Sequence, residues 1–277
     1  MPSGPLTHEQ AAAFHEDGFV ILRRFFDTEE MSLLLRTAKA DQVLRRKEIG
    51  LKDSAGRQSK LSLWNHPGDD LYGTIARCER VVNSVEQLLG GEVYHYHSKM
   101  MLKEPKVGGA WEWHQDYGYW YSNGCLYPDL ASCLIAVDRA SKANGCIQML
   151  KGSHKMGRIE HGRFGEQTGA DPERVNAALA RMELVYCECE PGDAVIFHGN
   201  TLHCSGPNES ENPRWSLICC YNKATNDPYK DSHHPRYTPL RKVPDSAIKE
   251  AGARGLADNA AFLELSTAQN ATANARG

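Results

Sequence analysis

The sequence predicts a mostly β protein with supporting helices, arranged as a double-stranded β-helix of the jelly-roll, cupin-like kind. Two observations carry this prediction. Helix caps and helical apolar spacing dominate the chain before Gly90, whereas short apolar runs separated by Gly, Pro and Asn follow it as far as Tyr221. Helices followed by many short strands are typical of a double-sheet barrel supported by helices. We therefore expect the N-terminal helices to pack on one of the two sheets.

Capping residues mark the first two helices. Thr7 and Gln10 have the form of a capping box, and Gly18 ends the helix that follows them. Residues 19–22 are a strand-like apolar run. Asp27 is a candidate N-cap for a second helix, in which apolar residues recur at helical spacing. The chain therefore begins with a helix, a strand and a second helix.

The remaining elements are less sharply marked. Residues 48–70 are polar and predict a loop, and residues 71–89 predict a third helix that Gly90-Gly91 stops. Short strands are expected at residues 93–102, 132–137, 146–150, 184–189, 194–197 and 215–221.

An insertion interrupts the strand region at residues 155–182. Its first part, 155–169, contains four glycines and predicts a loop, and residues 172–182 predict a helix. A loop this long inside a compact domain is uncommon and is usually functional or disordered. Two interpretations stay open: a surface insertion, or a lid in which Arg158, His161 and Arg163 meet a polar or anionic substrate.

Composition limits the classes of partner and of compartment. We expect one domain over residues 1–265 and a disordered tail over 266–277. The formal net charge of −3 and the absence of a basic block argue against nucleic acid and anionic membranes as partners. No leader pattern is visible, and no apolar run approaches the roughly 20 residues of a membrane span. The nine Cys, an odd number, then predict reduced thiols in a cytoplasmic protein. A homo-oligomer stays open.

A His and an Asp separated by one residue lie in the aromatic stretch 111–117. On an extended chain, positions i and i+2 project to the same side, so His114 and Asp116 face one point. This pair is common by chance, and a reactive metal needs a third ligand. His203 is the strongest candidate, with His198 as its closest rival. Two imidazoles and one carboxylate on one face of a metal, with positions left open, are the pattern of non-haem Fe(II) oxygenases.

Two further polar residues follow the candidate ligands. Arg214 opens the next strand-like run, and its planar guanidinium suits a bidentate carboxylate such as the far end of 2-oxoglutarate. Ser205 lies two residues after His203 and could donate its hydroxyl to the same carboxylate. Several aromatic residues beside the His-x-Asp pair are also what a small-molecule pocket needs. We expect Trp113 and Tyr117 to lie near the substrate and the other aromatics to pack.

Two functions of other classes remain open from the residues alone. A β-barrel that binds metal without turnover, as a sensor or pseudoenzyme, would use the same ligands. A hydrolytic zinc site would as well, since two imidazoles and a carboxylate also serve zinc. The zinc interpretation leaves Arg214 and Ser205 without a role.

The same motifs resemble a known family. His114-x-Asp116, His203-x-Ser205 and Arg214, in this order, are similar to the phytanoyl-CoA dioxygenase family of Fe(II)/2-oxoglutarate oxygenases. The likeness runs from about residue 14 to about residue 221, and it is nearest to the branch that holds ectoine hydroxylase. The resemblance implies that the protein binds Fe(II), 2-oxoglutarate and O2. It also implies that the protein hydroxylates a C–H bond of a small, polar metabolite with release of succinate and CO2.

The resemblance also implies roles for single residues. It assigns His114, Asp116 and His203 to iron, and Arg214 with Ser205 to the distal carboxylate of 2-oxoglutarate. Lys60 and Lys99 fall where relatives place neighbours of the cosubstrate. Leu134 falls where relatives often carry a Trp beside the cosubstrate, so that contact differs in this chain.

Overall fold

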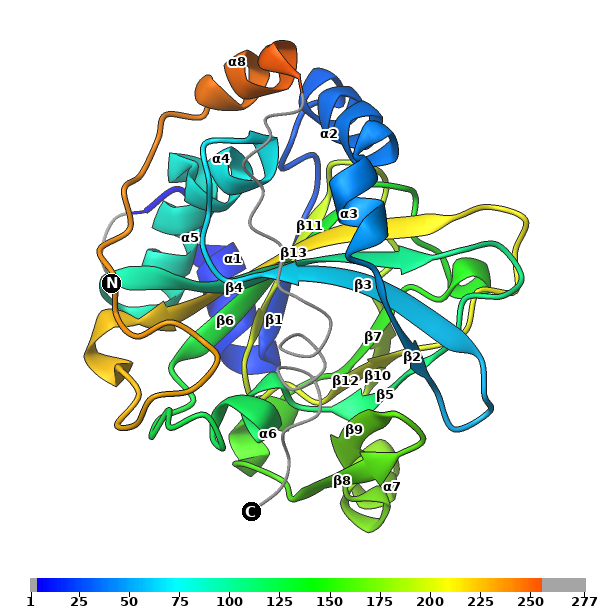
Figure 1. The fold of residues 1–277 in the computed structure, drawn as a ribbon. Helices are drawn as coiled ribbons and strands as arrows, with labels where there is room; N and C mark the ends of the chain where they lie inside the picture. The colour runs from blue at the N-terminus through cyan, green and yellow to red at the C-terminus, as the bar shows by residue number, and fades with distance from the viewer. Residues whose placement is uncertain (1–3, 256–277) are drawn as a thin grey trace.

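Two facing β-sheets form the centre of the protein, of which the computed structural model describes residues 4–255 (Figure 1). The large sheet contains, in spatial order, β1 (Phe19–Leu22), β11 (Ala194–His198), β6 (Leu130–Ala136), β13 (Arg214–Lys223), β4 (Val93–Lys103), β3 (Gln58–Trp64) and β2 (Ile49–Lys52). The small sheet contains β10 (Leu184–Tyr186), β7 (Ile147–Leu150), β12 (His203–Ser205) and β5 (Trp111–His114). This architecture confirms the predicted double-sheet fold.

Helices cover the outer face of the large sheet (Figure 1). They are α1 (His8–Asp17), α2 (Thr28–Ala40), α3 (Gln42–Arg46), α4 (Leu71–Arg77), α5 (Glu79–Leu89) and α8 (Ala247–Arg254). Their buried apolar side chains form one core with the outward-facing residues of the sheet. The helices therefore support the large sheet from one side and leave its other face to the site.

Alternation along β13 separates the two faces of the large sheet. Leu217 and Cys219 belong to the core beneath the helices, whereas Ile218 and Cys220 belong to a second core between the two sheets. Arg214 has the same parity as Ile218, so the period of a strand directs it into the space between the sheets. The polar residues of the site are thus placed inside by ordinary strand geometry.

The predicted helix caps are confirmed. Thr7 and Gln10 form a capping box, and Gly18 ends α1 with a φ of 87° in the left-handed region that favours glycine. Asp27 forms a second capping box with Glu30 at the start of α2.

Residues 48–70 were expected to form a loop, and this prediction was wrong. They contain β2 and β3, which pair at the edge of the large sheet. Their inward residues Leu51, Leu61 and Leu63 are buried, whereas polar residues such as Lys52 and Gln58 point outward. An edge strand with one exposed face carries enough polar residues to hide its apolar alternation.

The single helix predicted over residues 71–89 is instead two helices. Cys78 has an extended backbone, with φ −63° and ψ 144°, and separates α4 from α5. The helical spacing on either side of this residue gave no sign of the break.

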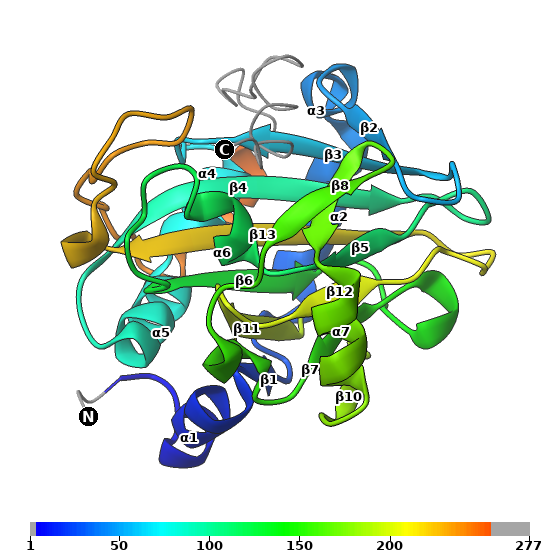
Figure 2. The same cartoon turned by 90° about the horizontal axis from the view of Figure 1, so that it is seen from below.

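The insertion is a β-hairpin followed by a helix. β8 (His161–Phe164) pairs with β9 (Gln167–Ala170), and α7 (Pro172–Leu179) follows. Gly165 occupies the turn with a φ of 59°. Seen from below, β8 and α7 cross the near side of the large-sheet strands (Figure 2). The expectation of a loop over 155–169 was therefore wrong, and the expected helix is present.

Other sequence predictions are only partly within the described residues. The nine cysteines are all buried and unpaired, as expected for reduced thiols. No helix among residues 4–255 is long and apolar enough to cross a membrane. The expected tail over residues 266–277 lies outside the described residues, and the single domain over 1–265 stays a prediction.

Candidate active site

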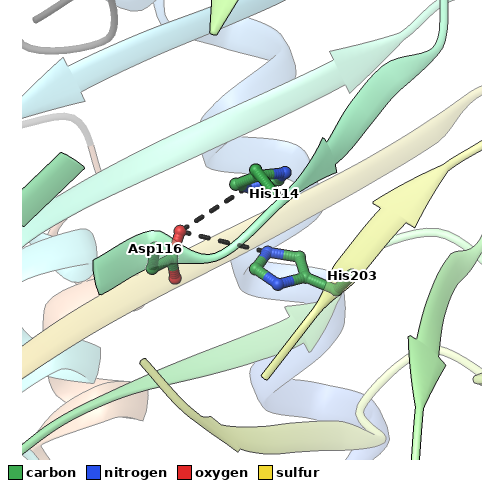
Figure 3. Close-up of side chains that lie close together, drawn as sticks. All are labelled: His114, Asp116 and His203. Carbon is green, nitrogen blue, oxygen red and sulfur yellow. Dashed lines mark ion pairs between the residues drawn. The ribbon is translucent and has the colours of Figure 1, made fainter. Parts of the chain in front are cut away.

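Three candidate metal ligands converge between the two sheets (Figure 3). His114 ends β5, His203 begins β12, and the two residues lie opposite each other in the antiparallel pairing of these strands. Asp116 is the first residue of α6 (Asp116–Trp120). One ligand atom from each of the three lies within 4.8 Å of the other two, and all three side chains are buried. The structure thus brings together the set that the sequence predicted.

Backbone carbonyls fix the direction of both imidazoles. His114 Nδ1 donates to Glu112 O at 2.7 Å, and His203 Nδ1 donates to Thr201 O at 2.8 Å. Because a carbonyl only accepts, each Nδ1 carries the hydrogen and each Nε2 keeps a free lone pair. Burial lowers the pKa of both rings, which holds them neutral. Two preformed nitrogen ligands result.

Asp116 completes the set from the other side. Its Oδ1 lies 3.7 Å from His114 Nε2 and 3.9 Å from His203 Nε2 (Figure 3). Its Oδ2 accepts a hydrogen bond of 2.7 Å from the hydroxyl of Ser132. One carboxylate oxygen is therefore held by the protein while the other points at the two free lone pairs.

Ser132 is a functional candidate that the sequence prediction missed. It lies in β6, whose neighbouring residues are all buried and otherwise apolar. A hydroxyl in such a strand needs a buried partner, since an unsatisfied polar group is costly. That lone Ser in an apolar run was the available signal in the sequence.

Gln115 holds together the two segments that carry the ligands. Its side-chain amide donates to Gly157 O and Asn200 O, and its side-chain oxygen accepts from Ile159 N at 2.7 Å. Asn200 lies three residues before His203 (203 − 200 = 3). Gln115, which is fully buried, therefore fixes the turn before β12 relative to the end of β5.

One cavity extends from the two histidines to Arg214, and we call it the Arg214 cavity. Ser205, Lys99 and Leu134 line it as well. Arg214 is 4% exposed and donates to two uncharged acceptors, Ser216 Oγ at 3.0 Å and Gly145 O at 2.9 Å. Its Nε is buried, and residues 4–255 offer it no hydrogen-bond partner. Burial lowers the pKa of this guanidinium to about 10, which still leaves it charged at neutral pH.

A second cavity lies on the other side of the candidate ligands, and we call it the His97 cavity. It is lined by His97, Lys99, Trp111, Tyr119 and Trp120 beside His114 and Asp116. His97 is buried, and its Nδ1 has no hydrogen-bond partner. Its ring stacks on that of His234, with 4.8 Å between centroids and 19° between planes. Lys99 lines both cavities.

The two aromatic residues that were expected near the substrate lie elsewhere. A β-bulge in β5 sets two residues, 112 and 113, against Cys204 of β12. This bulge turns Trp111 toward the cavities. Trp113, the direct neighbour of His114, faces away from them by ordinary strand alternation and packs against a small apolar core next to α7. The Tyr117 hydroxyl donates to Cys125 O and Leu126 O. Neither Trp113 nor Tyr117 lines either cavity in the described part of the chain.

Lys60, which was expected near the cosubstrate, and His198, the rival candidate for the third ligand, both have partners outside the cavities. Lys60 forms an ion pair with Glu48 at 3.2 Å and is not among the described residues that line the cavities. His198, the rival of His203, packs against Phe14 and His154, with ring centroids 6.2 and 5.5 Å away. The structure therefore separates both residues from the candidate ligands.

The hairpin is fastened to the helix that carries Asp116. His161 Nε2 accepts from Gln115 N at 3.0 Å, and the Tyr119 hydroxyl donates to Thr168 O at 2.7 Å. His161 is therefore engaged inside the protein, while Arg158 pairs with Glu160 and Arg163 donates to Gly165 O. None of these three residues is among the described residues that line the two cavities, and both interpretations of the insertion, lid and surface decoration, stay open as predictions.

Two buried imidazoles and one carboxylate that converge between two sheets are the pattern of non-haem iron oxygenases. Residues 14–216 match the family model of phytanoyl-CoA dioxygenase (PhyH). This segment is well over half of the chain. The chain therefore belongs to the phytanoyl-CoA dioxygenase family. Both the family and the expectation of a dioxygenase are thereby confirmed.

Named relatives agree with this family. The chain is 28% identical to L-proline trans-4-hydroxylase of Streptomyces griseoviridis over 260 residues, which cover 88% of this chain and 95% of the relative. It is 26% identical to ectoine dioxygenase of Bordetella parapertussis over 248 residues, covering 83% and 80%.

Solved structures of a further relative share the fold. EctD from S. alaskensis with bound Fe superposes with a TM-score of 0.75 at 22% identity, covering 88% of this chain and 89% of that one. EctD with 2-oxoglutarate and 5-hydroxyectoine gives a TM-score of 0.69 at the same identity, covering 90% and 88%. The predicted jelly-roll class is confirmed by this likeness.

We predict that replacing any one of the three candidate ligands by Ala abolishes stoichiometric Fe(II) binding while the fold survives. Each change removes one of the three donor atoms that converge within residues 4–255. Fe(II) titration and circular dichroism on His114→Ala, Asp116→Ala and His203→Ala measure the two effects. His198→Ala is the matched control and should bind Fe(II) normally. Normal binding by His203→Ala together with loss in His198→Ala would refute the assignment.

We predict that Ser132→Ala weakens Fe(II) binding by roughly 10- to 100-fold, the usual effect of losing a partner that orients a metal ligand. The change frees Oδ2 of Asp116 and lets the carboxylate rotate. Ser62→Ala is the control, because Ser62 is also buried in the large sheet but donates to Leu44 O. Equal Fe(II) affinities for the two variants would show that Ser132 does not orient Asp116.

Proposed function

We propose that this protein is an Fe(II)- and 2-oxoglutarate-dependent hydroxylase that acts on a small polar metabolite. The observation that carries the proposal is one continuous arrangement. Three ligand atoms converge, two of them on histidines that line the Arg214 cavity, and the same cavity holds a buried arginine for which residues 4–255 supply no carboxylate partner. Iron and 2-oxoglutarate, which are named in the structures of EctD, fit these two ends.

His114, Asp116 and His203 would hold the iron. The two nitrogens are neutral, oriented and free to donate their lone pairs, and Asp116 supplies one negative charge. A donor set of two imidazoles and one carboxylate suits a divalent iron with open coordination positions.

Arg214 would bind the distal carboxylate of 2-oxoglutarate. Its guanidinium has five N–H donors, of which two are used in hydrogen bonds to Ser216 and Gly145. A buried cation with an unsatisfied Nε is costly unless an anion completes it. A planar carboxylate in the Arg214 cavity would meet this need, with Ser205 beside it.

The His97 cavity would hold the substrate. Its aromatic walls, Trp111, Tyr119 and Trp120, offer shape and exclude water, and the free Nδ1 of His97 offers one hydrogen bond. Lys99 could meet a negatively charged group of the substrate or cosubstrate at the border of the two cavities. A small polar molecule matches these features. L-proline and ectoine, which occur in the names of two relatives, belong to that class.

The bound iron and cosubstrate would supply oxidative decarboxylation to succinate and CO2, coupled to hydroxylation of a C–H bond. The protein itself would position the cosubstrate and the substrate and would enclose the reacting groups. Arg214 would fix the far end of the cosubstrate, and Ser132 would hold Asp116 in place. The aromatic wall would keep water away from the substrate.

The proposed function is tested by measuring succinate formation from 2-oxoglutarate with Fe(II) or Zn(II) in the presence of O2. We expect succinate to form with Fe(II) and not with Zn(II). We also expect the true substrate to speed up O2 consumption when a metabolite panel that includes L-proline and ectoine is screened. Zinc-dependent hydrolysis without succinate would indicate a zinc enzyme. Metal binding without any turnover over the panel would indicate a sensor or pseudoenzyme.

We predict that Arg214→Lys weakens the apparent affinity for 2-oxoglutarate by roughly tenfold or more, which corresponds to about 1.4 kcal/mol. Lysine keeps the charge but loses the planar fork that matches a carboxylate. Iron content should be unchanged. Arg236→Lys is the control, because Arg236 forms an exposed ion pair with Asp227. If both variants keep the wild-type dependence on 2-oxoglutarate, Arg214 does not bind it.

A further inference from the structure

The peptide group that joins His114 to Gln115 lies between two of the three candidate metal ligands. Its N–H belongs to Gln115, the N-cap residue of α6, and the N–H of an N-cap lies outside the hydrogen bonds of its own helix. This N–H donates to His161 Nε2 at 3.0 Å. The residue that holds the backbone between the two ligands therefore comes from the insertion, more than 40 residues further along the chain.

His161 is held as a hydrogen-bond acceptor. Its Nδ1 donates to Ile159 O at 2.8 Å, and because a carbonyl only accepts, Nδ1 carries the ring hydrogen. Burial lowers the pKa of the ring to about 4, so it is neutral at neutral pH. The lone pair on Nε2 is then fixed in direction and points at the N–H of Gln115.

Gly118 makes room for this ring. A Cβ atom at Gly118 would overlap with the imidazole of His161, so no larger residue fits in α6 at this position while the ring stays where it is. Alanine is a better helix former than glycine. The glycine in α6 is therefore explained by the close approach of His161 and not by the helix itself.

The hairpin also holds the residues on either side of the ligands, and it lies along β5 (Figure 1). Gln167 Oε1 accepts from the N–H of Glu112 at 3.0 Å, and the carbonyl of Glu112 orients the ring of His114. The Tyr119 hydroxyl donates to Thr168 O, and the Tyr119 ring lies 5.5 Å from that of His114. The hairpin thus contacts the segment before, between and after the two ligands.

We propose that the hairpin of β8 and β9 is a clamp for the metal site and that His161 is its positioning residue. His161 fixes the peptide between His114 and Asp116, so that both ligands face one point before a metal arrives. The inference rests on the proposed function, since these are the ligands assigned to iron there.

A clamp behaves differently from a lid and from a surface insertion. If docking of the hairpin favours metal binding, metal binding must favour docking by the same factor. A clamp therefore responds to the metal alone, whereas a lid responds when cosubstrate and substrate are both bound. A surface insertion responds to neither.

Hydrogen exchange on the wild-type protein tests this coupling without any substitution. The apoprotein and the anaerobic Fe(II)-loaded protein are compared. Amides of β8 and β9 should exchange at least about threefold more slowly with Fe(II) alone, because opening of the hairpin is then opposed by the metal. Amides of α1, which lies on the outer face of the large sheet, are the control and should not change. Unchanged exchange in the hairpin, or equal slowing in α1, would overturn the proposal.

Two substitutions of His161 separate its acceptor from its bulk. His161→Leu fills similar space without an acceptor and should weaken Fe(II) binding by roughly tenfold, the lower end of the usual effect of losing a partner that orients a metal ligand. His161→Gln can place its side-chain oxygen near the position of Nε2, so its Fe(II) affinity should stay within about threefold of the wild type. A role in packing alone predicts equal losses for the two variants. That result, or normal binding by His161→Leu, would contradict the clamp.

Gly118→Ala displaces the imidazole without changing any hydrogen-bonding group. Alanine favours the helix, so an effect on α6 alone predicts no loss, whereas the clamp predicts Fe(II) binding weaker by roughly tenfold. Gly162→Ala is the matched control in the same hairpin, because its Cβ would meet no atom within 4 Å.

The comparison of these two glycine variants also decides the matter if His161→Leu does not fold. Equal Fe(II) affinities for Gly118→Ala and Gly162→Ala would overturn the proposal. Failure of the wild-type protein itself to bind Fe(II) would instead contradict the proposed function, and this inference with it.

Discussion

The antiparallel pairing of β5 with β12 is the constraint on which the site depends. This pairing sets His203 directly opposite His114, and the backbone carbonyls of Glu112 and Thr201 then turn both Nε2 atoms to the same point. Asp116 reaches that point because Gln115 stays extended before α6 begins. The bulge in β5 brings Trp111 to the same face. A shift of the register by one residue would move each of these side chains to the opposite face.

The space between the sheets holds charge that the fold alone does not explain. Arg214 of β13 and Lys103 of β4 lie opposite each other in the pairing of these strands, and both are buried. Within residues 4–255, their side chains donate to hydroxyls and backbone carbonyls and not to carboxylates. Burying two like charges destabilises a folded protein unless an anion compensates them. Their positions are understood if stability is given up for a site that is organised before its dicarboxylate ligand arrives. At the other end of the Arg214 cavity, the imidazoles of His114 and His203 are neutral and oriented, so they are likewise organised before a metal arrives.

The sequence predicted the chemistry of the site better than its surroundings. His114, Asp116, His203, Arg214 and Ser205 were found because their residue types and order are specific, and the structure brings them to one place. The family and the fold class were likewise predicted and are confirmed.

The errors have particular physical causes. β2 and β3 were missed because edge strands carry polar residues on their outer face. Trp113 was misplaced because it is the direct neighbour of His114, and strand alternation sends it to the opposite face; the bulge in β5, which the sequence does not announce, brings Trp111 to the His114 face in its place. Ser132 and Lys103 were missed because their importance lies in contacts with residues far away in the chain. A lysine at a strand end is ordinarily solvated, and only the tertiary structure shows that this one is buried.

The most direct test of the central claim is a crystal structure of the protein grown anaerobically with Fe(II) and 2-oxoglutarate, with anomalous scattering recorded at the iron edge. The account predicts one anomalous peak bounded by His114 Nε2, Asp116 Oδ1 and His203 Nε2. It also predicts 2-oxoglutarate in the Arg214 cavity, with its distal carboxylate on the guanidinium. An iron peak elsewhere, or a cosubstrate whose distal carboxylate lies away from Arg214, would contradict the account.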